Sequence, residues 1–545
     1  MKRSLVTVLL VVILIGLGGF LRFYKNSENP ISLNNDEVAF GYNAYSILKT
    51  GRDENGVFMP IFFSSVGDYK NPVPVYSMVP SIAIFGLNEF GIRFSTALAG
   101  TLSIPFFFFL LLSLLKDKRI ALIGTALLAI SPWHIFYSRY VSDHVIALLF
   151  LILGMWFFQK MLEGKKVWAV LSAFFLILSM YTYYTNRLFT PIFVLVCLIL
   201  NYKKLYLKKG LFLTFILICF ILSLPLIYFS LFGSVNARAA MVFLGQDIDY
   251  TRYVILDHLQ RKGEIFLLFF FWIKRYLNYF EPDFLFFTGL NMTTPGILGL
   301  GVAHLFELPW LILGIIELLR NKIRNKALII SWILVGIIPA SITNNEQNTG
   351  RSLLILPAFL LIVSLGVLSF FRLINKIKNN YFKISLIGIY TLFIGVLLIQ
   401  SFLIFAVHFP RQRGEAFMEG TKETVLYALA NKDKYREIVY DPYRGIEAPY
   451  IVNIPHEYIL FYSKYDPYTY QMGLRRFGKE LYSFDKFTIR RIDWRVDRNK
   501  KDTLFIGSPW SLPEKDIKES EMLQKVYLSS GSLAFLIVSP NPITE

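Results

Sequence analysis

Long apolar segments recur along this chain, and they constrain its fold more than any other feature of the sequence. A helix needs roughly 17–25 residues to cross the hydrocarbon core of a bilayer. The sequence therefore predicts an α-helical polytopic membrane protein with about eleven transmembrane helices. The eleven apolar runs are 4–23, 94–115, 119–136, 142–162, 167–184, 188–202, 211–232, 297–319, 327–343, 352–374 and 384–407.

Composition agrees with this class. Apolar residues make up 55% of the chain and charged residues only 17%, which is more apolar than a water-soluble protein of 545 residues needs to be. Cys197 and Cys219 are the two cysteines; both lie inside apolar runs, which argues against a disulfide framework. The net charge of +18 is explained largely by membrane topology, so we expect no nucleic-acid partner.

Basic residues follow every even-numbered apolar run, as the positive-inside rule requires of cytoplasmic turns. Lys2 and Arg3 precede the first run, and no small-residue cleavage site follows it, so we expect a retained first helix with the N-terminus inside. Eleven spans then place the C-terminus outside the cytoplasmic membrane. The basic turns contain Lys116, Lys118, Arg119, Lys165, Lys166, Lys203, Lys204, Lys208, Lys209, Arg320, Lys322, Arg324, Lys326, Arg372, Lys376, Lys378 and Lys383.

Three predicted outer regions are long. Residues 24–93 form a first outer loop and residues 233–296 a second, both within a transmembrane domain of residues 1–407. Residues 408–545 form an extracytoplasmic C-terminal domain. Its sequence alternates strand-like with helical segments, which predicts a small α/β fold. The strand-like segments are 438–440, 503–506 and 533–538, and a helical one is 421–430.

Asp36 and Glu37 are adjacent carboxylates about a dozen residues after the first apolar run, on the predicted outer side. Apolar residues over 38–48 recur at roughly helical spacing, and Gly51 fits a C-cap. We expect a short amphipathic helix along the membrane surface with the two carboxylates at its start. Such a pair can remove a proton or bind a metal beside a lipid-borne substrate. A solvated helix start is the alternative.

Single arginines occupy the three short outer turns: Arg139, Arg187 and Arg351. They run against the charge bias, and the planar guanidinium suits the phosphate of a lipid-linked donor. Interfacial snorkelling or pairing with a nearby acid is the alternative. Lys70 lies in a proline-containing segment of the first loop and offers another phosphate contact, with a solvated lysine as the alternative. Asp68 is a further site candidate.

Asp143 and His144 fall at the predicted outer start of the fourth span, where an ionisable group is costly without a partner or a polar cavity. A helix N-cap at Asp143 is the alternative. Asp36 and Asp143 could share a divalent cation such as Mg²⁺ or Mn²⁺, although no dense oxygen-ligand loop is present. Tyr183 ends the fifth span among aromatic residues that suit either an interfacial belt or stacking on a sugar ring.

Several familiar motifs are absent from the sequence, among them a Walker loop, a dinucleotide-binding glycine pattern, a nucleophile elbow and His/Cys metal spacing. Their absence disfavours ATP-driven transport and use of soluble nucleotide sugars. A flippase or transporter of lipid-linked sugars remains an alternative, but it should carry polar residues in mid-membrane. Here the ionisable residues collect at the outer ends of spans, which favours an interfacial enzyme. A cell-envelope scaffold needs none of the outer arginines.

Several short motifs in the first loop and beyond resemble those of a known family. Residues 35–37, 41–53 and 67–70 are similar to the bacterial glycosyltransferase 39 or ArnT-like membrane family, which has the GT-C fold and is related to protein O-mannosyltransferases (PMT). The likeness covers most of residues 24–410 and, more loosely, the C-terminal domain. Supporting stretches are 131–134, 183–191, 283–287 and 306–309.

This resemblance implies a glycosyltransferase that moves a sugar from a polyprenyl-phosphate donor to a lipid, glycan or protein acceptor outside the cytoplasmic membrane. It implies that Asp36 is the catalytic base or orients the acceptor, with Glu37 beside it, and that Lys70 contacts the donor phosphate. Asp143 matches a second acidic position approximately. The chain departs from the family pattern at Asn71, which replaces a proline. We expect an inverting displacement, and neither the sugar nor the acceptor is specified by the sequence.

Overall fold

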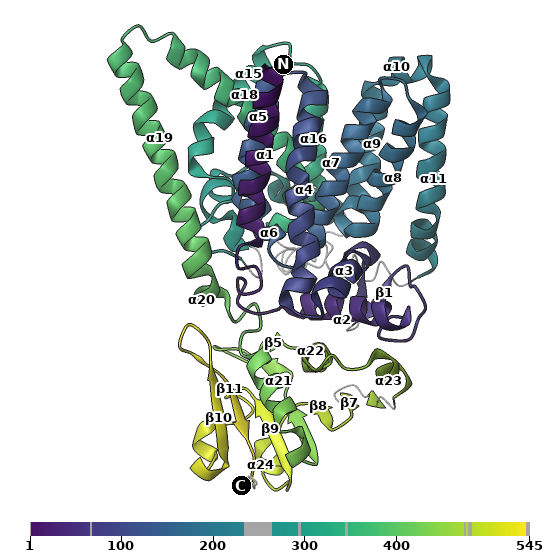
Figure 1. The fold of residues 1–545 in the computed structure, drawn as a ribbon, viewed down its shortest axis with the longest axis vertical. Coiled ribbons are helices and arrows are strands. Elements are labelled where there is room, and N and C mark those ends of the chain that lie inside the picture. Colours follow the sequence, from purple (N-terminus) through teal and green to yellow (C-terminus); the bar gives the residue numbers. More distant parts are fainter. Residues whose placement is uncertain are drawn as a thin grey trace. The chain divides into compact units, whose positions relative to one another are not determined.

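The structure is a computed structural model, which describes residues 2–65, 68–233, 264–292, 296–343, 347–473, 476–477 and 482–540. The chain divides into two units, each described here by itself (Figure 1). Unit 1 contains Met1–Tyr24, Asn71–Pro74 and Thr96–Ile404, and unit 2 contains Lys25–Lys70, Val75–Ser95 and Phe405–Glu545. Most of the first loop therefore groups with the C-terminal segment, whereas the sequence analysis assigned that loop to the domain 1–407.

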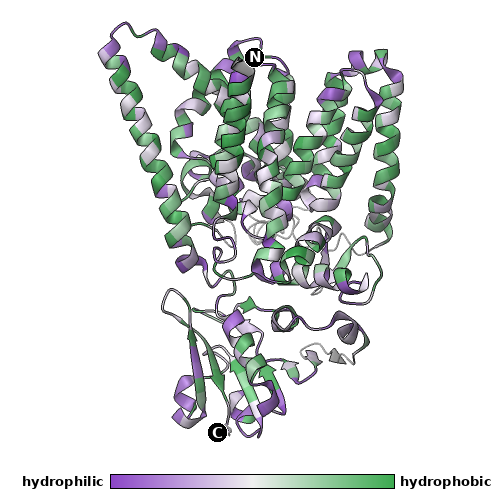
Figure 2. Ribbon diagram, viewed as in Figure 1, coloured by the Kyte–Doolittle hydropathy of each residue, from purple (hydrophilic) through white to green (hydrophobic). Residues whose placement is uncertain are grey.

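Unit 1 is a bundle of apolar helices, and Figure 2 shows hydrophobic residues along most of their length. Neighbouring helices in the bundle include the pairs α7–α8, α8–α11, α9–α16, α1–α5 and α15–α18. The helices are α1 (Lys2–Phe23), α4 (Glu89–Leu115, whose first turns belong to unit 2), α5 (Lys118–Ile130), α6 (Pro132–Ser138), α7 (Asp143–Met161), α8 (Lys166–Thr182), α9 (Tyr184–Leu200), α10 (Tyr202–Leu207), α11 (Lys209–Phe232), α14 (Glu264–Asn278), α15 (Leu308–Arg320), α16 (Lys326–Ser341), α17 (Thr349–Ser352), α18 (Leu356–Asn375) and α19 (Asn380–Leu403).

Six helical stretches among the described residues are long and apolar enough to cross a bilayer. The bent pair α5–α6 makes a seventh if it counts as one span, and α8, α9 and α16 are shorter apolar helices. The predicted fold class, a multi-pass helical membrane protein, is confirmed, while the number of eleven spans stays a prediction. The six stretches are Leu5–Phe23, Glu89–Leu115, Asp143–Met161, Lys209–Phe232, Thr349–Asn375 and Asn380–Arg413.

The apolar run 119–136 is not the single straight helix that the sequence predicted. It bends by 53° between α5 and α6, because Pro132 lacks an N–H and begins a new helix. Arg22 of α1 satisfies carbonyl groups freed at this break: its Nη1 donates to Ala129 O at 3.1 Å and its Nη2 to Leu128 O at 3.1 Å. Its Nη2 also lies 2.8 Å from His134 Nδ1. A charged side chain thus stabilises the end of α5, as a helix C-terminus favours.

The run 297–319 was also wrong as a single span, because α15 begins only at Leu308. The preceding residues form a loop and a short 3₁₀ turn, Leu305–Glu307. Gly301 in this loop lies against the backbone of Phe286, where a Cβ would have no room. Glycines that allow such close backbone approach are poor helix residues, which accounts for the late start of α15.

Unit 2 contains a mixed seven-stranded sheet in the order β10-β11-β9-β3-β8-β7-β6, in which β3 is parallel to both β8 and β9 and the other pairs are antiparallel. The predicted α/β character of the C-terminal segment is confirmed. Val439, Phe505 and Leu536 share one apolar cluster with Trp494. The strands are β3 (Glu437–Tyr440), β6 (Arg476–Phe477), β7 (Tyr482–Phe484), β8 (Phe487–Ile489), β9 (Thr503–Gly507), β10 (Met522–Tyr527) and β11 (Leu533–Val538), with a separate pair β4 (Tyr443–Arg444) and β5 (Ile451–Val452).

The first-loop part of unit 2 contains the helix α2 (Asn35–Thr50), the hairpin β1–β2 (Phe63–Ser65 and Asp68–Lys70) and α3 (Pro72–Phe85) from Val75 onward. Helices of the C-terminal segment pack against α2. They are α22 (Pro455–Ser463) and α23 (Pro467–Met472); α20 (Phe409–Arg413), α21 (Thr421–Ala430) and α24 (Trp494–Asp497) are the other helices of that segment.

Helix α2 begins and ends as the sequence predicted, with Gly51 as its C-cap at φ 69°. It is not the amphipathic surface helix that we expected, because most of its residues are buried inside unit 2. The hydroxyl of Tyr458 on α22 donates to Leu33 O at 2.7 Å, and Tyr42 of α2 donates to Tyr465 O at 3.2 Å. Gly41 permits this packing, since a Cβ there would lie 2.9 Å from the Phe461 ring.

Candidate active site

The N-terminus of α2 carries the two carboxylates that the sequence singled out. Asn34 caps the helix: its side chain accepts from Glu37 N at 3.0 Å, and Glu37 Oε2 accepts from Asn34 N at 3.0 Å. This capping box satisfies amide groups that a helix start otherwise leaves unpaired. It turns Glu37 inward and leaves Asp36, one residue earlier, pointing to the surface, with 54% of its side chain exposed.

Glu37 forms a fully buried ion pair with Arg93. Arg93 Nε and Nη2 donate to the two carboxylate oxygens at 2.8 and 3.1 Å, and both side chains are inaccessible to solvent. The same guanidinium donates to the carbonyl oxygens of Asn26, Pro30 and Ser32. All of these hydrogen bonds stabilise the fold of residues 26–37. The contacts therefore give Glu37 a structural role, and its place among the catalytic candidates stays a prediction.

Asp36 pairs with Lys70, as the sequence analysis had grouped them. Lys70 Nζ donates to Asp36 Oδ1 at 2.6 Å, and only 9% of the lysine side chain is exposed. Lys70 ends β2 and lies opposite Phe63 in the hairpin register, so the strand pairing fixes the lysine backbone. The ammonium group and the N-terminal end of α2 both place positive charge next to the Asp36 carboxylate. The result is an exposed carboxylate held by a buried lysine.

Asn71, the residue after Lys70, belongs to unit 1 and contacts one of the predicted arginines there. Arg187 Nη2 donates to Asn71 Oδ1 at 2.6 Å, and Asn71 is buried. The amide at position 71, where the family pattern has proline, thus supplies an acceptor that proline lacks. Asp68 lies in β2 opposite Ser65 in the hairpin register, and its side chain falls outside what the structure describes.

A second group of predicted residues gathers around His144 in unit 1. Its ring lies 4.7 Å from the Tyr137 ring and 4.2 Å from the Tyr183 ring, measured between centroids. Asp143 Oδ1 lies 3.1 Å from His144 Nδ1. Ser142, not Asp143, is the N-cap of α7, so the predicted alternative role of Asp143 as a cap is wrong. Asp143, His144 and Tyr183 therefore form one polar and aromatic cluster.

Arg351 and Arg187 border this cluster, whereas Arg139 serves another purpose. Arg351 lies within electrostatic range of Tyr137, and Arg187 within range of Asp143. Arg351 Nη1 is buried, and no described residue forms a hydrogen bond with it. Arg139 is buried and donates to the carbonyl oxygens of Leu21 and Tyr24 at 2.8 and 2.6 Å, so it stabilises the C-terminus of α1. This geometry gives Arg139 a structural role, and its predicted phosphate contact stays a prediction.

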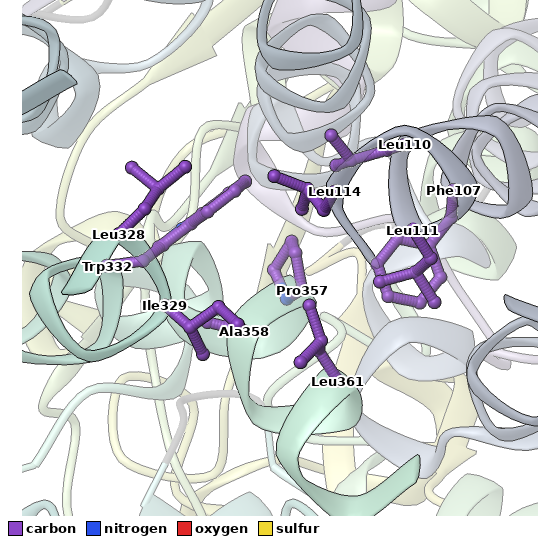
Figure 3. Close-up of a pocket in the computed structure, with 10 residues that line it drawn as sticks. All are labelled: Phe107, Leu110, Leu111, Leu114, Leu328, Ile329, Trp332, Pro357, Ala358 and Leu361. Atoms are coloured by element: carbon purple, nitrogen blue, oxygen red, sulfur yellow. The ribbon is translucent and has the colours of Figure 1, made fainter. Parts of the chain in front are cut away.

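No group of three or more His, Cys, Asp or Glu side chains among the described residues is placed to hold a metal ion. Asp36 belongs to unit 2 and Asp143 to unit 1, so a shared cation stays a prediction. A pocket in unit 1 is small and apolar, with a volume of about 10 Å³, which is barely enough for one water molecule (Figure 3). It is lined by Phe107, Leu110, Leu111, Leu114, Leu328, Ile329, Trp332, Pro357, Ala358 and Leu361. It offers nothing to a phosphate or a sugar.

Sequence reasoning missed several polar residues around these positions. Arg93 carried the same signal as the three predicted arginines, a positive charge at the outer end of a span, but it lies at the end of a long loop instead of in a short turn. Glu54 and Glu457 gave no local signal, because each acquires its environment from a segment far away in the chain. Thr349, whose Oγ1 lies 2.8 Å from the Tyr137 hydroxyl, is equally ordinary in sequence.

The helices and the polar groups at their ends define the class of protein. The chain is a multi-pass membrane protein whose ionisable side chains of interest lie at helix ends and in unit 2, not in mid-helix. Its residues 12–241 match the family model described as dolichyl-phosphate-mannose-protein mannosyltransferase (PMT).

Solved structures show the same fold over nearly the whole chain. ArnT from Cupriavidus metallidurans, bound to undecaprenyl phosphate, has a TM-score of 0.53 at 11% identity, and its apo state has a TM-score of 0.54 at 12% identity. Each match covers 97% of both chains. The oligosaccharyltransferase AglB from Archaeoglobus fulgidus, in complex with an inhibitory peptide and a dolichol-phosphate, has a TM-score of 0.50 at 15% identity, covering 79% of this chain and 58% of that one.

An uncharacterised protein of Aquifex aeolicus is 26% identical over 166 residues, which is 30% of this chain and 31% of that protein. The chain thus matches less than a third of the length of this curated relative. The partial family match and the shared fold agree with the predicted resemblance: the chain has an ArnT-like fold of the GT-C type, and residues 12–241 are similar to the PMT family.

Proposed function

We propose that this chain transfers a sugar from a polyprenyl-phosphate donor to an acceptor on the outer side of the cytoplasmic membrane. The match to the PMT family and the ArnT-like fold support a membrane glycosyltransferase. The ArnT structure holds undecaprenyl phosphate, and the AglB structure holds a dolichol-phosphate, which supports a lipid-linked donor. The basic turns after even-numbered apolar runs support an inside N-terminus and an outside site.

The observation that carries the proposal is the ion pair between Asp36 and Lys70. The exposed carboxylate is accessible to an acceptor hydroxyl, and the buried ammonium carries the charge that a phosphate needs. A base and a phosphate ligand held 2.6 Å apart suit a reaction in which an acceptor and a lipid phosphate meet at one sugar carbon. If Asp36 and Lys70 were two separate solvated charges, the lysine would not need to be buried.

The proposed reaction is a single inverting displacement. Asp36 takes the proton of the acceptor hydroxyl as its oxygen attacks the anomeric carbon, and the bond from that carbon to the phosphate oxygen breaks. Polyprenyl phosphate leaves with the bonding electrons, and Lys70 stabilises its charge. The donor is already activated by its phosphate, so no nucleotide is needed. Arg187 and Arg351 belong to unit 1, where their polar and aromatic surroundings make them separate candidates for binding a phosphate.

The test is a transfer assay with the full chain in lipid, using radiolabelled polyprenyl-phosphate sugars and an envelope extract as acceptor. Asp36→Asn should lower the transfer rate by about 10²–10⁴-fold, the usual contribution of a positioned base, and leave donor binding nearly unchanged. Glu28→Gln is the matched control, because Glu28 is an exposed acid of the same loop in a long 3.7 Å pair with Lys25. Near-wild-type transfer by Asp36→Asn would refute the role of Asp36.

Lys70→Met should weaken binding of polyprenyl phosphate, whereas Lys49→Met, which removes an exposed lysine from α2, should not. Equal affinities of the two variants would remove Lys70 from the phosphate site. If the wild type binds or moves labelled donor across the bilayer but transfers no label for any donor of a broad panel, the flippase alternative replaces the transferase.

A further inference from the structure

Two buried carboxyl groups in unit 2 take no part in the proposed reaction. Glu54 follows α2 in the first loop and Glu457 lies on α22 of the C-terminal segment, and they are only 5% and 1% exposed. The two carboxyl groups lie within hydrogen-bonding range of each other. Glu457 forms no ion pair with any basic residue that the structure describes. Two acidic side chains buried next to each other are rare, so the pair calls for an explanation.

A hydrogen bond between two carboxyl groups requires a proton on one of them, because ionised carboxylates only accept. Burial raises the pKa of Glu457 well above its ordinary value, and the neighbouring charge of Glu54 raises it further. Burial also raises the pKa of Glu54, against the hydrogen bonds from Glu457, Asn43 and Ser65, which lower it. Two neighbouring carboxyl groups in a buried site do not both ionise readily, because the charge of each one opposes ionisation of the other.

The pair is connected to Lys70 through the β1–β2 hairpin. Ser65 at the end of β1 donates to Glu457 Oε1 at 3.4 Å, and it also hydrogen-bonds the Glu54 carboxyl group. Two residues before Ser65, Phe63 pairs with Lys70 across the hairpin. The charge of Lys70 acts on Glu457 itself. The hairpin therefore has the carboxyl pair at one end and the bond from Lys70 to Asp36 at the other.

Other charged or titratable groups face the pair from the packed elements. Asp53 in the loop after α2 adds a negative charge next to Glu54. Burial and the charges of both carboxyl groups raise the pKa of Tyr482 on β7. The His456 ring of α22 lies 4.5 Å from the Tyr482 ring, measured between centroids. Lys70 supplies the positive charge among the groups that act on Glu457. One added negative charge on the pair thus meets a surrounding that is already acidic.

We propose that Glu54 and Glu457 share one proton and act as positioning residues that hold the Lys70 hairpin against the C-terminal segment. Loss of that proton places two negative charges side by side in a buried site, which loosens the hairpin and releases Lys70 from Asp36. The C-terminal segment then does more than cover the site, because it sets the position of Lys70, the residue that binds the phosphate. The role of Lys70 as that ligand rests on the proposed function, whereas the shared proton does not.

The sign of the expected pH dependence follows from linkage. An acid whose pKa is raised in the folded state keeps its proton after the unfolded chain has lost it. The stabilisation is fully present below the ordinary carboxyl value of 4.5 and is lost as the pH rises through the raised value. The wild type should therefore become less stable from mildly acidic to mildly alkaline pH.

The experiment measures the unfolding temperature of the full chain in lipid from about pH 5 to about pH 8. The wild type should lose stability as the pH rises, and Glu457→Gln, which keeps a hydrogen-bonding amide without a titrating proton, should flatten the profile. Glu447→Gln is the matched control, because Glu447 is an exposed acid of the same segment, and it should reproduce the wild-type profile. Glu54→Gln supplies a second variant if Glu457→Gln does not fold.

The second readout is binding of polyprenyl phosphate at each pH. Affinity should fall by about tenfold or more across the range in the wild type and vary much less in Glu457→Gln, which a general packing defect would not produce. Wild-type stability that does not fall with pH, or glutamine variants that parallel the wild type, would overturn the shared proton. A Glu457-dependent stability profile without polyprenyl phosphate binding at any pH would support the carboxyl pair and refute the proposed function.

Discussion

Asp36 and Glu37 are neighbours in the chain, yet the first turn of α2 sends them to opposite environments. Glu37 turns into the unit, where Arg93 holds both of its oxygens, and Asp36 stays at the surface, where Lys70 reaches it. The rotation of about 100° per residue in a helix is enough to separate their roles. At the residue scale, position relative to the N-cap decides which carboxylate is available for chemistry.

Glu37→Gln should destabilise the fold, because it leaves the buried Arg93 charge without its counter-charge. We expect the free energy of unfolding to fall by about 3–5 kcal/mol, the usual cost of breaking a buried ion pair. The double variant Glu37→Gln/Arg93→Met should lose less than the sum of the two single variants, since no buried charge is left alone. Thermal or denaturant unfolding in lipid measures both.

Glu28→Gln is the control for this prediction too, because the pair of Glu28 with Lys25 is exposed and contributes less than about 1 kcal/mol. If Glu37→Gln unfolds like the wild type but loses transfer, Glu37 is part of the chemistry and its structural assignment is wrong.

The sequence predicted part of this site and missed the rest for a physical reason. The three arginines stood out because positive charge is depleted in outer turns. Asp36 stood out because it adjoins Glu37 soon after the first apolar run, and Lys70 because it lies in a proline-containing segment of the same loop. The structure pairs Asp36 with Lys70 and gathers Asp143, His144 and Tyr183. Glu54, Glu457 and the partner of Glu37 depend on contacts between distant segments, which neither spacing nor composition encodes.

At the scale of elements, apolar length predicted helices well and their breaks poorly. Pro132 and the glycines near Gly301 are local signals of a helix break. However, proline and glycine also occur inside continuous membrane helices, as Pro225 does in α11. Whether a helix breaks at such a residue depends on whether a neighbouring group satisfies the freed carbonyl groups, as Arg22 does at the end of α5. The short strands 438–440, 503–506 and 533–538 were predicted correctly because they are apolar runs between turn residues.

The packing of α22 on α2 depends on the missing side chain at Gly41. Gly41→Ala should favour the isolated helix by roughly 1 kcal/mol but destabilise the protein, because the new methyl group lies 2.9 Å from both Ile92 and Phe461. Adding Phe461→Leu should recover part of the stability by making room. Unfolding temperatures of the two variants test this, and Gly388→Ala in α19, where a Cβ meets nothing, is the control. A more stable Gly41→Ala would show that α22 does not pack as described.

For the whole molecule, the two units divide the chain in a way that sequence order does not suggest. Unit 2 joins residues 25–95, apart from 71–74, with residues 405–545. Tyr42, Tyr458 and Gln471 are among the contacts that connect its two parts; the amide of Gln471 reaches Ser46, Thr50 and the Asp53 carbonyl at 2.9–3.1 Å. Neither part retains its buried surface without the other.

A chain that ends at residue 404 should therefore keep the helices of unit 1 and lose the protection of its first loop. Trypsin should cleave the truncated chain after Lys49, Arg52 or Lys70 much faster than it cleaves the full chain, because α2 loses the cover of α22 and α23. Mass spectrometry of the fragments gives the sites. Equal cleavage rates in the two chains would show that the first loop folds by itself.

The contact between Ser65 and Glu457 spans 392 residues of sequence, and this separation has a consequence for how the protein is made. At roughly 5–20 residues per second, the ribosome needs about 20–80 s to produce Glu457 after Ser65 has been synthesised. During that time the segment with Asp36 and Lys70 lacks its contacts with the C-terminal segment, while the helices of unit 1 insert. Until the last quarter of the chain has been translated and has folded, unit 2 therefore remains incomplete.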